Sequence, residues 1–330
     1  MSDSKEKRVA IIDTGYDSYE QEKEILGRSG YVLDVFSGDR HDTAGKTAFA
    51  RGAVGLLVRW TPIDEAFLDT ASTVRALVRY GVGYDNIDLA AASARKIPVC
   101  NVQGYANHSV SDHALALILA CVRDIRMGLE QLRPSYGAPP CTYMPELHEM
   151  TLGIVGLGRI GGTLCTKACG LFQRVLACDP YIPPERFTAL GAEACSLDEL
   201  IAASDVVTLH CSLTKETRHL INAASFDRMG PHAVLVNTAR GPVVDEEALM
   251  VALEEGTIFA AGLDVFEDEP PRSNRDALLS HPRVVATGHY AWYSVRASRE
   301  LQRRAALNLD AMLRGEIPED CLNREAFGVG

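Results

Sequence analysis

Three polar residues of types that can bind a carboxylate or transfer a proton follow apolar runs in the second half of the chain. Arg240 stands in VNTARGPVVDE, Glu269 in LDVFEDEPP and His289 in ATGHYAWYS. An arginine fork can bind a carboxylate with two parallel hydrogen bonds. A histidine changes charge near neutral pH and can therefore pass a proton, while a glutamate beside it stabilises the imidazolium. Together they predict a site that binds a 2-oxo or 2-hydroxy carboxylate and moves the proton that accompanies a hydride.

Each of these residues taken alone also has an ordinary structural explanation. Arg240 could be a surface arginine, the acidic run 267–269 a solvated face, and His289 a capping residue. The functional interpretation requires that the preceding strands end at one edge of a parallel sheet, where ligands bind.

The stretch 151–179 has the pattern of a dinucleotide-binding unit. A short apolar strand leads into Gly156, Gly158 and Gly161 in G-x-G-x-x-G spacing, then a helix and a second strand that ends at Asp179. The first glycine permits a tight turn, the second lets the backbone approach a pyrophosphate, and the third lets the helix pack closely on the strand. A glycine-rich turn without a ligand is the alternative, which the surrounding strand, helix and acidic residue disfavour. Asp179 would accept from the ribose hydroxyls and repel a 2′-phosphate, so we expect NAD(H) rather than NADP(H).

The hydrophobic pattern around this unit predicts an α/β protein with two doubly wound parallel sheets. The expected strands are 8–13, 31–36, 52–58 and 75–78 in the first hundred residues, and 152–155, 174–177, 206–209, 233–236, 258–263 and 284–286 further on. Helices are expected at 18–28, 109–125, 245–255 and 294–314, with a capping box at Ser196 and Glu199. Residues 127–150 are rich in proline, glycine and polar residues, and we expect them to be irregular.

The distribution of these elements predicts two domains, since 330 residues exceed the usual size of a single core. The first strands have no G-x-G-x-x-G of their own, and the last helix follows the final strand of the larger sheet, so it is free to return to the first domain. We expect residues 1–102 plus 294–330 to form a smaller, flavodoxin-like substrate-binding domain. Residues 103–293 would be an inserted Rossmann NAD-binding domain.

Composition excludes several classes of partner. A net charge of −11 without a Lys/Arg cluster argues against nucleic acid or an anionic membrane. The start, MSDSKEKRVAIID, has no apolar segment long enough for a signal peptide or membrane span, so we expect a cytoplasmic protein. The nine cysteines are odd in number and scattered, which indicates reduced thiols. Cys165 and Cys169 have no further ligand at metal-binding spacing, and we expect no metal site.

The motifs GVGYDNID, GIVGLGRIG, LHCSLT, NTARGPVVDEEAL, LDVFEDEP and GHYAWYS resemble the D-isomer specific 2-hydroxyacid dehydrogenases over nearly the whole chain. The segments HYAWYSVRAS and DPYIP are similar to the branch that contains the C-terminal-binding protein corepressors and their bacterial relatives. The resemblance implies that Arg240, Glu269 and His289 are catalytic. The family usually has proline before the active-site histidine, where this chain has Gly288, which allows more backbone conformations.

The resemblance also implies the binding residues. The amides of Val82 and Gly83, in a turn whose free N–H groups can hold a carboxylate, match the family's carboxylate-binding turn. Positions that match residues near NAD are Gly156, Gly158, Arg159, Ile160, Gly161, Asp179, His210, Cys211, Thr217, Thr238, Asp264 and Ala291. A homodimer built on the cofactor domain is implied as well, with residues 109–150 as the expected contact.

The activity implied is the NAD-dependent interconversion of a small 2-hydroxy acid and its 2-oxo acid. A binding protein of another class, which senses NAD like the corepressors and has little turnover, stays open because its catalytic residues would be the same. Arg59 directly follows an apolar strand and is similar to an arginine that meets the phosphate in phosphoglycerate dehydrogenases. We therefore expect a substrate with a second anionic group such as phosphate or phosphonate; pairing of Arg59 with a surface carboxylate is the alternative.

Overall fold

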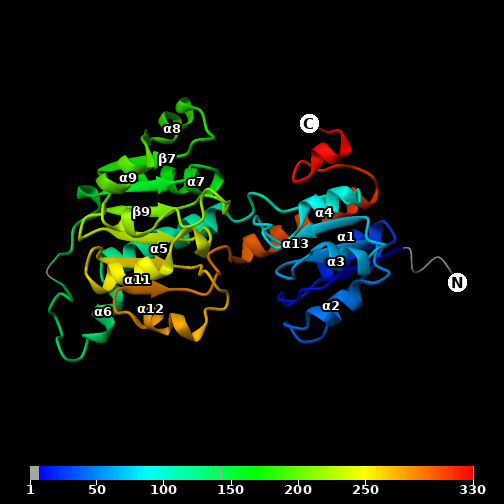
Figure 1. Cartoon of the computed structure of the whole chain (residues 1–330), viewed down its shortest axis with the longest axis horizontal. Coiled ribbons are helices and arrows are strands. Elements are labelled where there is room, and N and C mark those ends of the chain that lie inside the picture. Colours follow the sequence, from blue (N-terminus) through cyan, green and yellow to red (C-terminus); the bar gives the residue numbers. More distant parts are fainter. Residues whose placement is uncertain (1–6, 142, 330) are drawn as a thin grey trace. The chain divides into compact units, whose positions relative to one another are not determined.

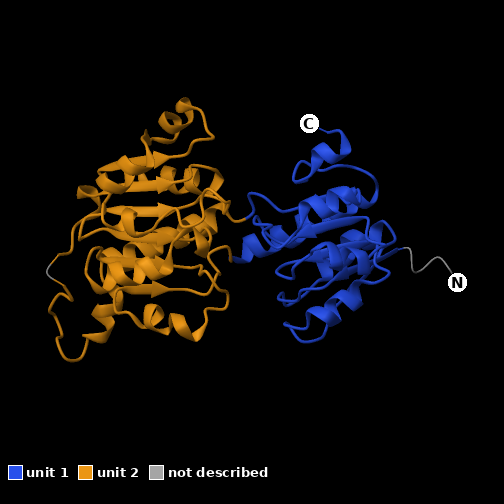
Figure 2. Cartoon of the chain, viewed as in Figure 1, with its two compact units in different colours: residues 1–105, 294–330 blue, residues 106–293 orange. Residues whose placement is uncertain are grey.

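The computed structural model describes residues 7–141 and 143–329, which divide into two compact units (Figures 1 and 2). Unit 1 contains the chain up to Tyr105 together with the part from Ser294 onward, and unit 2 runs from Ala106 to Tyr293. Each unit is an α/β layer structure around one parallel sheet. The expectation of two parallel-sheet α/β domains is confirmed.

In the described part of unit 1, five parallel strands form a sheet with the order β2-β1-β3-β4-β5, the flavodoxin-like order. The strands are β1 (Arg8–Ile11), β2 (Val32–Val35), β3 (Gly55–Val58), β4 (Ala76–Arg79) and β5 (Val99–Cys100). The helices are α1 (Glu20–Arg28), α2 (Thr43–Ala50), α3 (Glu65–Thr70), α4 (Leu89–Ala94) and α13 (Val295–Leu313). Alternate strand residues such as Leu56 and Val58 pack with the apolar side chains of α2 and α3, so one face of the sheet is covered by these helices.

Helix α13 belongs to unit 1, although it follows the last strand of the larger sheet in the sequence. The Ser294 hydroxyl caps the helix by accepting from the N–H of Ala297, and Gly315, with φ +90°, ends it. Leu309 and Leu313 lie 3.2 and 3.1 Å from the point where a Cβ on Gly55 would stand. A glycine in β3 therefore lets this helix pack closely on the sheet.

Seven parallel strands make up the sheet that the structure describes in unit 2, with the order β12-β11-β10-β9-β6-β7-β8. Counted from β6, this is the Rossmann order 3-2-1-4-5-6 with one added strand. The strands are β6 (Thr151–Val155), β7 (Arg174–Cys178), β8 (Glu193–Ala194), β9 (Val206–Leu209), β10 (Val234–Asn237), β11 (Ala260–Leu263) and β12 (Val284–Ala286). The helices are α5 (Asn107–Val122), α6 (Ile125–Glu130), α7 (Arg159–Ala168), α8 (Pro184–Leu190), α9 (Leu197–Ala203), α10 (Ala223–Phe226), α11 (Glu246–Glu254) and α12 (Asp276–Ser280).

Helices cover both faces of this sheet. Ile154 of β6 belongs to the apolar cluster formed with α5 and α7, whereas the next residue, Val155, belongs to the cluster formed with α9, α11 and α12. This alternation along a strand that is buried on both sides explains why β6 is apolar almost throughout. The expected capping box at α9 is present, since the Ser196 hydroxyl accepts from the N–H of Glu199 and the Glu199 carboxylate accepts from the N–H of Ser196.

The segment after the first long helix of unit 2 differs from the expectation. The helix expected at 109–125 begins at Asn107 and ends at Val122, and α6 begins at Ile125 and continues into the stretch expected to be irregular. Asp124, with φ +47°, separates the two helices because its left-handed backbone cannot continue either one. Short helices α2, α3 and α4 were also not expected, although Asp42, Asp64 and Asp88 cap them and are the sequence signal that could have found them.

Candidate active site

The glycine-rich turn of unit 2 joins β6 to α7. Gly156 has φ +91°, and a Cβ there would lie 2.7 Å from the backbone nitrogen of Cys211, which follows β9. A Cβ on Gly161 would lie 2.0 Å from the carbonyl oxygen of Gly156, so the first turn of α7 packs directly on the turn. Gly158 has open space where its Cβ would be. The turn therefore presents bare backbone at the start of a helix, the arrangement that accepts a pyrophosphate.

Asp179 lies beside this turn, just after β7. One of its carboxylate oxygens accepts from the N–H of Leu157 at 2.9 Å and the other from the N–H of Tyr181 at 3.0 Å. Each oxygen can accept a further hydrogen bond. A pocket of about 430 Å³ adjoins the carboxylate and is lined by Cys178, Asp179, Pro180, Phe187, Ala194, Cys195 and Ser196. A carboxylate at the edge of a pocket beside the glycine turn fits the ribose and base of a dinucleotide.

Two buried polar atoms near the ends of β9 and β10 fit the same ligand. In the described structure, His210 Nδ1 and Thr238 Oγ1 are buried and make no hydrogen bond. Burial lowers the pKa of His210 to about 4, so its imidazole is neutral at physiological pH. Buried polar groups usually have partners, and polar atoms of a bound cofactor would supply them here. Arg159 and Ile160 in the first turn of α7 and Thr217 in the loop after β9 complete the set expected on this side of the sheet.

The Glu269 and His289 side chains meet after β11 and β12. His289 Nδ1 lies 2.5 Å from Glu269 Oε2. Burial opposes ionisation of Glu269, but the hydrogen bond and charge of His289, with smaller contributions from the N–H of Phe266 and from Arg240, lower the pKa of this carboxyl. An ionised glutamate on one ring nitrogen fixes the orientation of the imidazole and leaves the other nitrogen, Nε2, to exchange a proton with a substrate.

A buried aspartate fixes the backbone around His289. Asp264 is 1% exposed and follows β11. Its carboxylate accepts from the Thr287 hydroxyl at 2.6 Å, from the N–H of Tyr290 at 3.1 Å and from the N–H of Ala291 at 2.9 Å, and its carbonyl accepts from the N–H of His289 at 2.7 Å. His289 has φ +54°, a conformation that costs a non-glycine residue on the order of 1–3 kcal/mol. Four hydrogen bonds to Asp264, one of them from the N–H of His289 and three from neighbouring residues, therefore hold the segment around the histidine.

Gly288, which precedes this histidine, is not needed for space. No atom lies within 4 Å of the position that its Cβ would take, and its φ lies outside the range that favours glycine. Since Asp264 holds the following residue, the freedom that glycine brings is restrained by its neighbours.

The Arg240 loop approaches the Glu269 loop through a glycine. A Cβ on Gly241 would lie 1.8 Å from the carbonyl carbon of Phe266, so only glycine allows the two backbones to come this close. The side chain of Asn237, 1% exposed, donates to the carbonyl of Arg240 at 2.9 Å and accepts from the N–H of Ala239 at 3.0 Å. The sequence interpretation did not include Asn237 or Gly241, although both flank the arginine that it singled out.

The acidic run 267–269 has three separate roles. Glu267 contacts His219 at 2.6 Å and Arg275 at 2.9 Å, whereas Asp268 pairs with Arg272 at 3.0 Å. Only the third acid faces His289. The sequence interpretation chose Glu269, the acid of the run that contacts His289, but the spacing alone gives no reason for that choice.

The turn with Val82 and Gly83 follows β4 in unit 1. Gly81, with φ +133°, opens the turn, and the side chain of Val82 is 41% exposed. The carbonyl of Val82 accepts from Asn101 Nδ2 at 2.6 Å, and the carbonyl of Gly81 accepts from the N–H of Val102 at 2.9 Å. Because these bonds hold the carbonyls toward the residues after β5, they fix the orientation of the turn's peptide groups.

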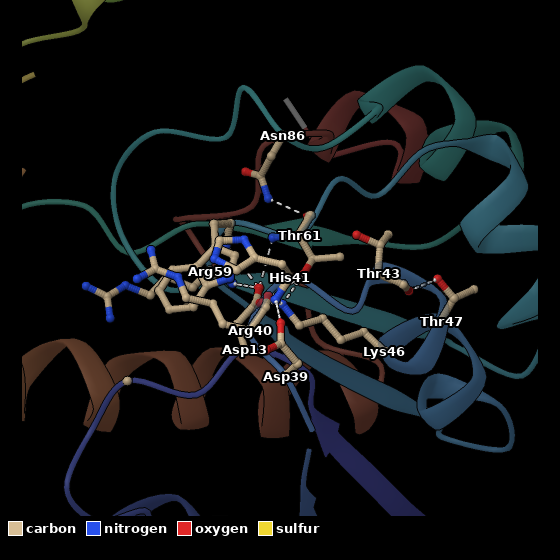
Figure 3. A network of polar contacts seen from close by, with 12 residues as sticks. Asp13, Asp39, Arg40, His41, Thr43, Lys46, Thr47, Arg59, Thr61 and Asn86 are labelled. Atoms are coloured by element: carbon tan, nitrogen blue, oxygen red, sulfur yellow. Dashed lines mark hydrogen bonds and ion pairs between the residues drawn. The ribbon is translucent and has the colours of Figure 1, made fainter. Parts of the chain in front are cut away.

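Arg59 lies at the end of β3, next to a buried ionic network that the sequence interpretation missed (Figure 3). Asp13 is fully buried, and its carboxylate accepts from Lys46 Nζ at 2.8 Å and from the backbone N–H groups of Arg59, Trp60 and Thr61 at 2.8, 2.9 and 3.0 Å. The Thr61 hydroxyl also donates to it at 2.6 Å. The acid therefore fixes the backbone of the arginine. An aspartate directly after an apolar strand is the signal that could have found it.

Aromatic rings hold the side chain of Arg59. Its guanidinium carbon lies 4.9 Å from the centre of the Trp60 ring and 5.5 Å from that of Tyr16. The guanidinium carbon of Arg40 lies 4.3 Å from the same tryptophan. Two positive groups and an indole thus meet at the carboxyl end of this sheet.

A Rossmann sheet with a nucleotide-binding turn, and a glutamate–histidine pair after neighbouring strands, define an NAD-dependent oxidoreductase. Comparison with known proteins gives the family. Residues 115–291 match the model of the D-isomer specific 2-hydroxyacid dehydrogenase, NAD binding domain. The chain belongs to the D-isomer specific 2-hydroxyacid dehydrogenase family, whose members transfer a hydride between NAD(H) and 2-hydroxy or 2-oxo acids.

Individual relatives agree with this assignment. The chain is 39% identical over 274 residues to a glyoxylate reductase of Korarchaeum cryptofilum, covering 81% of this chain and 82% of the relative. It is 38% identical over 280 residues to a glyoxylate/hydroxypyruvate reductase B of Salmonella schwarzengrund, covering 84% and 86%. Among solved structures, D-lactate dehydrogenase of Aquifex aeolicus with NAD and lactic acid superposes with a TM-score of 0.86 at 26% identity, covering 96% of this chain and 98% of that one.

Within the described residues, no helix combines the length and apolar character that a membrane crossing requires.

Proposed function

We propose that this protein reduces a small 2-oxo acid with NADH, or oxidises the matching 2-hydroxy acid with NAD, through His289 as the acid–base residue. The observation that carries the proposal is the 2.5 Å contact between His289 and Glu269 after adjacent strands of a Rossmann sheet. Relatives named glyoxylate reductase and glyoxylate/hydroxypyruvate reductase B make glyoxylate and hydroxypyruvate the first substrates to test.

Each residue has a defined role in the proposed reaction. NADH, when bound, supplies the hydride that adds to C2 of the 2-oxo acid. In the same step His289 donates its proton to the C2 oxygen, which becomes the hydroxyl group, and ionised Glu269 stabilises the imidazolium before the transfer. Arg240 and the amides of Val82 and Gly83 bind the acid group of the substrate. In the oxidative direction neutral His289 accepts the hydroxyl proton.

A turnover assay tests this function. The purified protein is mixed with NADH and a panel of 2-oxo acids that includes glyoxylate, hydroxypyruvate, pyruvate and 3-phosphohydroxypyruvate. Oxidation of NADH with formation of the D-hydroxy acid supports the proposal. Tight NADH binding without turnover on any member would instead support a binding protein that senses NAD.

We expect Asp179 to select NAD(H) over NADP(H). Asp179→Ala should weaken NADH binding and narrow the preference over NADPH by on the order of 1–3 kcal/mol, because a charged hydrogen bond and a repulsion of the 2′-phosphate are lost. Binding of both cofactors is measured by fluorescence titration. Asp198→Ala, at an exposed acid on α9 of the same unit, is the control. Equal affinity of the unmutated protein for NADH and NADPH would contradict the assignment.

We propose that Arg59 binds a second anionic group of the substrate. Its stacking on Trp60 and the network that fixes its backbone support a preformed anion site. Arg59→Ala should lower kcat/KM for a dianionic substrate such as 3-phosphohydroxypyruvate by roughly 10- to 100-fold and barely change it for glyoxylate. Arg75→Ala, at an exposed arginine that precedes β4, serves as the control. Equal losses for both substrates, or none, would assign Arg59 a structural role.

We also propose a cytoplasmic homodimer whose contact involves residues 109–150. Large apolar side chains in this stretch are exposed: Leu119, Ile125, Leu129, Leu132, Tyr136 and Tyr143, with exposed fractions from 38% to 87%. Such a concentration of exposed apolar side chains fits a surface that is covered by a partner. The nine cysteines are scattered over both units, and free thiols fit a reducing compartment. Light scattering of the unmutated protein and of Leu129→Lys tests the dimer, since a monomer in both cases would contradict it.

A further inference from the structure

The C-terminal segment of unit 1 pairs with β5 through two cysteines. Cys100 and Cys321 form an antiparallel bridge. The flanking backbone bonds run from the N–H of Leu322 to the carbonyl of Val99 at 2.7 Å and from the N–H of Asn101 to the carbonyl of Asp320 at 3.4 Å. Since the neighbours make these bonds, the cysteines are a non-hydrogen-bonded pair, whose Cα atoms are typically about 4.5 Å apart. This spacing lies within the range of about 4.4–6.8 Å that a disulfide spans.

The two thiols face each other in the interior. Cys100 is fully buried and Cys321 is 5% exposed. The Cys321 thiol donates to the side-chain oxygen of Asn323 at 3.4 Å. The sulfur of Met312 lies 3.4 Å from that of Cys100. The hydrogen bond from Cys100 outweighs burial and lowers the pKa of the Cys321 thiol. Cys321 is also the less buried of the two thiols, so a peroxide reaches it first, and a thiolate is the nucleophilic form of cysteine.

The residue after Cys100 links the pair to the carboxylate-binding turn. Asn101 donates from its side chain to the carbonyl of Val82 at 2.6 Å, while its own N–H donates to Asp320, the neighbour of Cys321. Arg304 holds Asp320 in turn, at 2.7 Å. A change in the distance between the two cysteines would therefore move Asn101 in two ways, through its peptide bond to Cys100 and through its hydrogen bond to Asp320. Because Asn101 holds the carbonyl of Val82, this movement would reach the carboxylate-binding turn.

We propose that Cys100 and Cys321 are a site of reversible oxidation by a peroxide, and that the resulting disulfide changes substrate binding at the Val82 turn. The second part rests on the proposed function. In the first step the Cys321 thiolate attacks one oxygen of hydrogen peroxide, the O–O bond breaks, and the products are a sulfenic acid and hydroxide, which takes up a proton to form water. In the second step Cys100 loses its proton, its sulfur attacks the sulfenyl sulfur, and the hydroxyl leaves as water. Two thiols and one peroxide thus give one disulfide and two waters.

The first test is chemical and needs no activity. The full-length protein is treated with hydrogen peroxide, remaining thiols are blocked, and the peptides are analysed by mass spectrometry before and after dithiothreitol. We expect a Cys100–Cys321 cross-link that dithiothreitol removes and that is absent from both Cys321→Ser and Cys100→Ser. Cys169→Ser, which removes an exposed thiol of unit 2, should still form it. Oxidation of Cys169 with Cys100 and Cys321 left as free thiols would overturn the proposal.

The second test measures the effect on binding. Oxidation should change KM for the 2-oxo acid by roughly threefold or more in the unmutated protein and in Cys169→Ser, and leave the Kd for NADH unchanged, since the cofactor-binding residues lie in unit 2. Cys321→Ser should show no change on oxidation. A cross-link that leaves KM unaltered would overturn the link to the Val82 turn. A cross-link in a protein with no turnover would count against the proposed function alone.

Discussion

Replacing His289 with alanine is expected to lower kcat for reduction of a 2-oxo acid by about 10²- to 10⁴-fold, the usual contribution of a positioned general acid. NADH binding should stay within about twofold of the unmutated protein, because the residues proposed to bind the cofactor are separate from the imidazole. Steady-state kinetics and fluorescence titration of NADH measure the two quantities. Unchanged turnover in His289→Ala would show that another group supplies the proton.

The pH profile separates the histidine from its partner. Interaction with His289 outweighs burial and lowers the pKa of Glu269, so this carboxylate stays ionised below the usual range of a glutamate. The reductive rate should therefore hold on the acid side until the pH falls below the usual range of a glutamate, where Glu269 takes up a proton and no longer stabilises the imidazolium. In Glu269→Gln the imidazolium has no charged partner at any pH, so the rate should be lower throughout and this acid-side fall should be absent. Glu267→Gln, which faces His219 and Arg275 instead, is the matched control and should leave the fall where it is.

The central strands and the glycine turn could be predicted because their signals are local. The structure has β9 at Val206–Leu209 and β12 at Val284–Ala286, the bounds that the apolar runs gave. A strand that is buried on both faces is apolar at every position, and this pattern needs no knowledge of its neighbours. The turn at Gly156 was equally local, since its φ of +91° requires a residue without a Cβ.

Features that depend on contacts between distant segments could not be predicted. A glycine is required at position 241 because the backbone of Phe266 passes next to it. Asp264 is important because its carboxylate accepts hydrogen bonds from N–H groups that follow β12. Asp124 separates two helices, but the composition of the sequence does not change at this point, so it gives no signal of the break. The roles within the run 267–269 were also hidden, because each acid meets a base from another part of unit 2 or of its own loop.

Replacing Asp13 with alanine is expected to lower the free energy of unfolding of unit 1 by about 3–5 kcal/mol, the cost of breaking a buried ion pair from one side. The change leaves Lys46, 3% exposed, without its carboxylate and removes the acceptor of three backbone N–H groups. Asp34→Ala is the control, because Asp34 also pairs with a base on this sheet but is 46% exposed, and such pairs contribute about 0–1 kcal/mol. Urea unfolding is followed by the fluorescence of Trp60 in a Trp292→Phe background.

The cause of this loss can be separated from simple loss of packing by removing both charges and by changing pH. Asp13→Ala combined with Lys46→Met should be more stable than Asp13→Ala alone, since no unpaired charge stays buried. Burial raises the pKa of Asp13, but the hydrogen bonds from Lys46 and Thr61 outweigh it, and the net shift is downward. The contribution is therefore complete above the unfolded value of about 3.9 and is lost as pH falls through the lower folded value. The free energy of unfolding of the unmutated protein and of Asp13→Ala should therefore converge at pH values far below this window. If the difference persists there undiminished, the charge of the carboxylate is not its source.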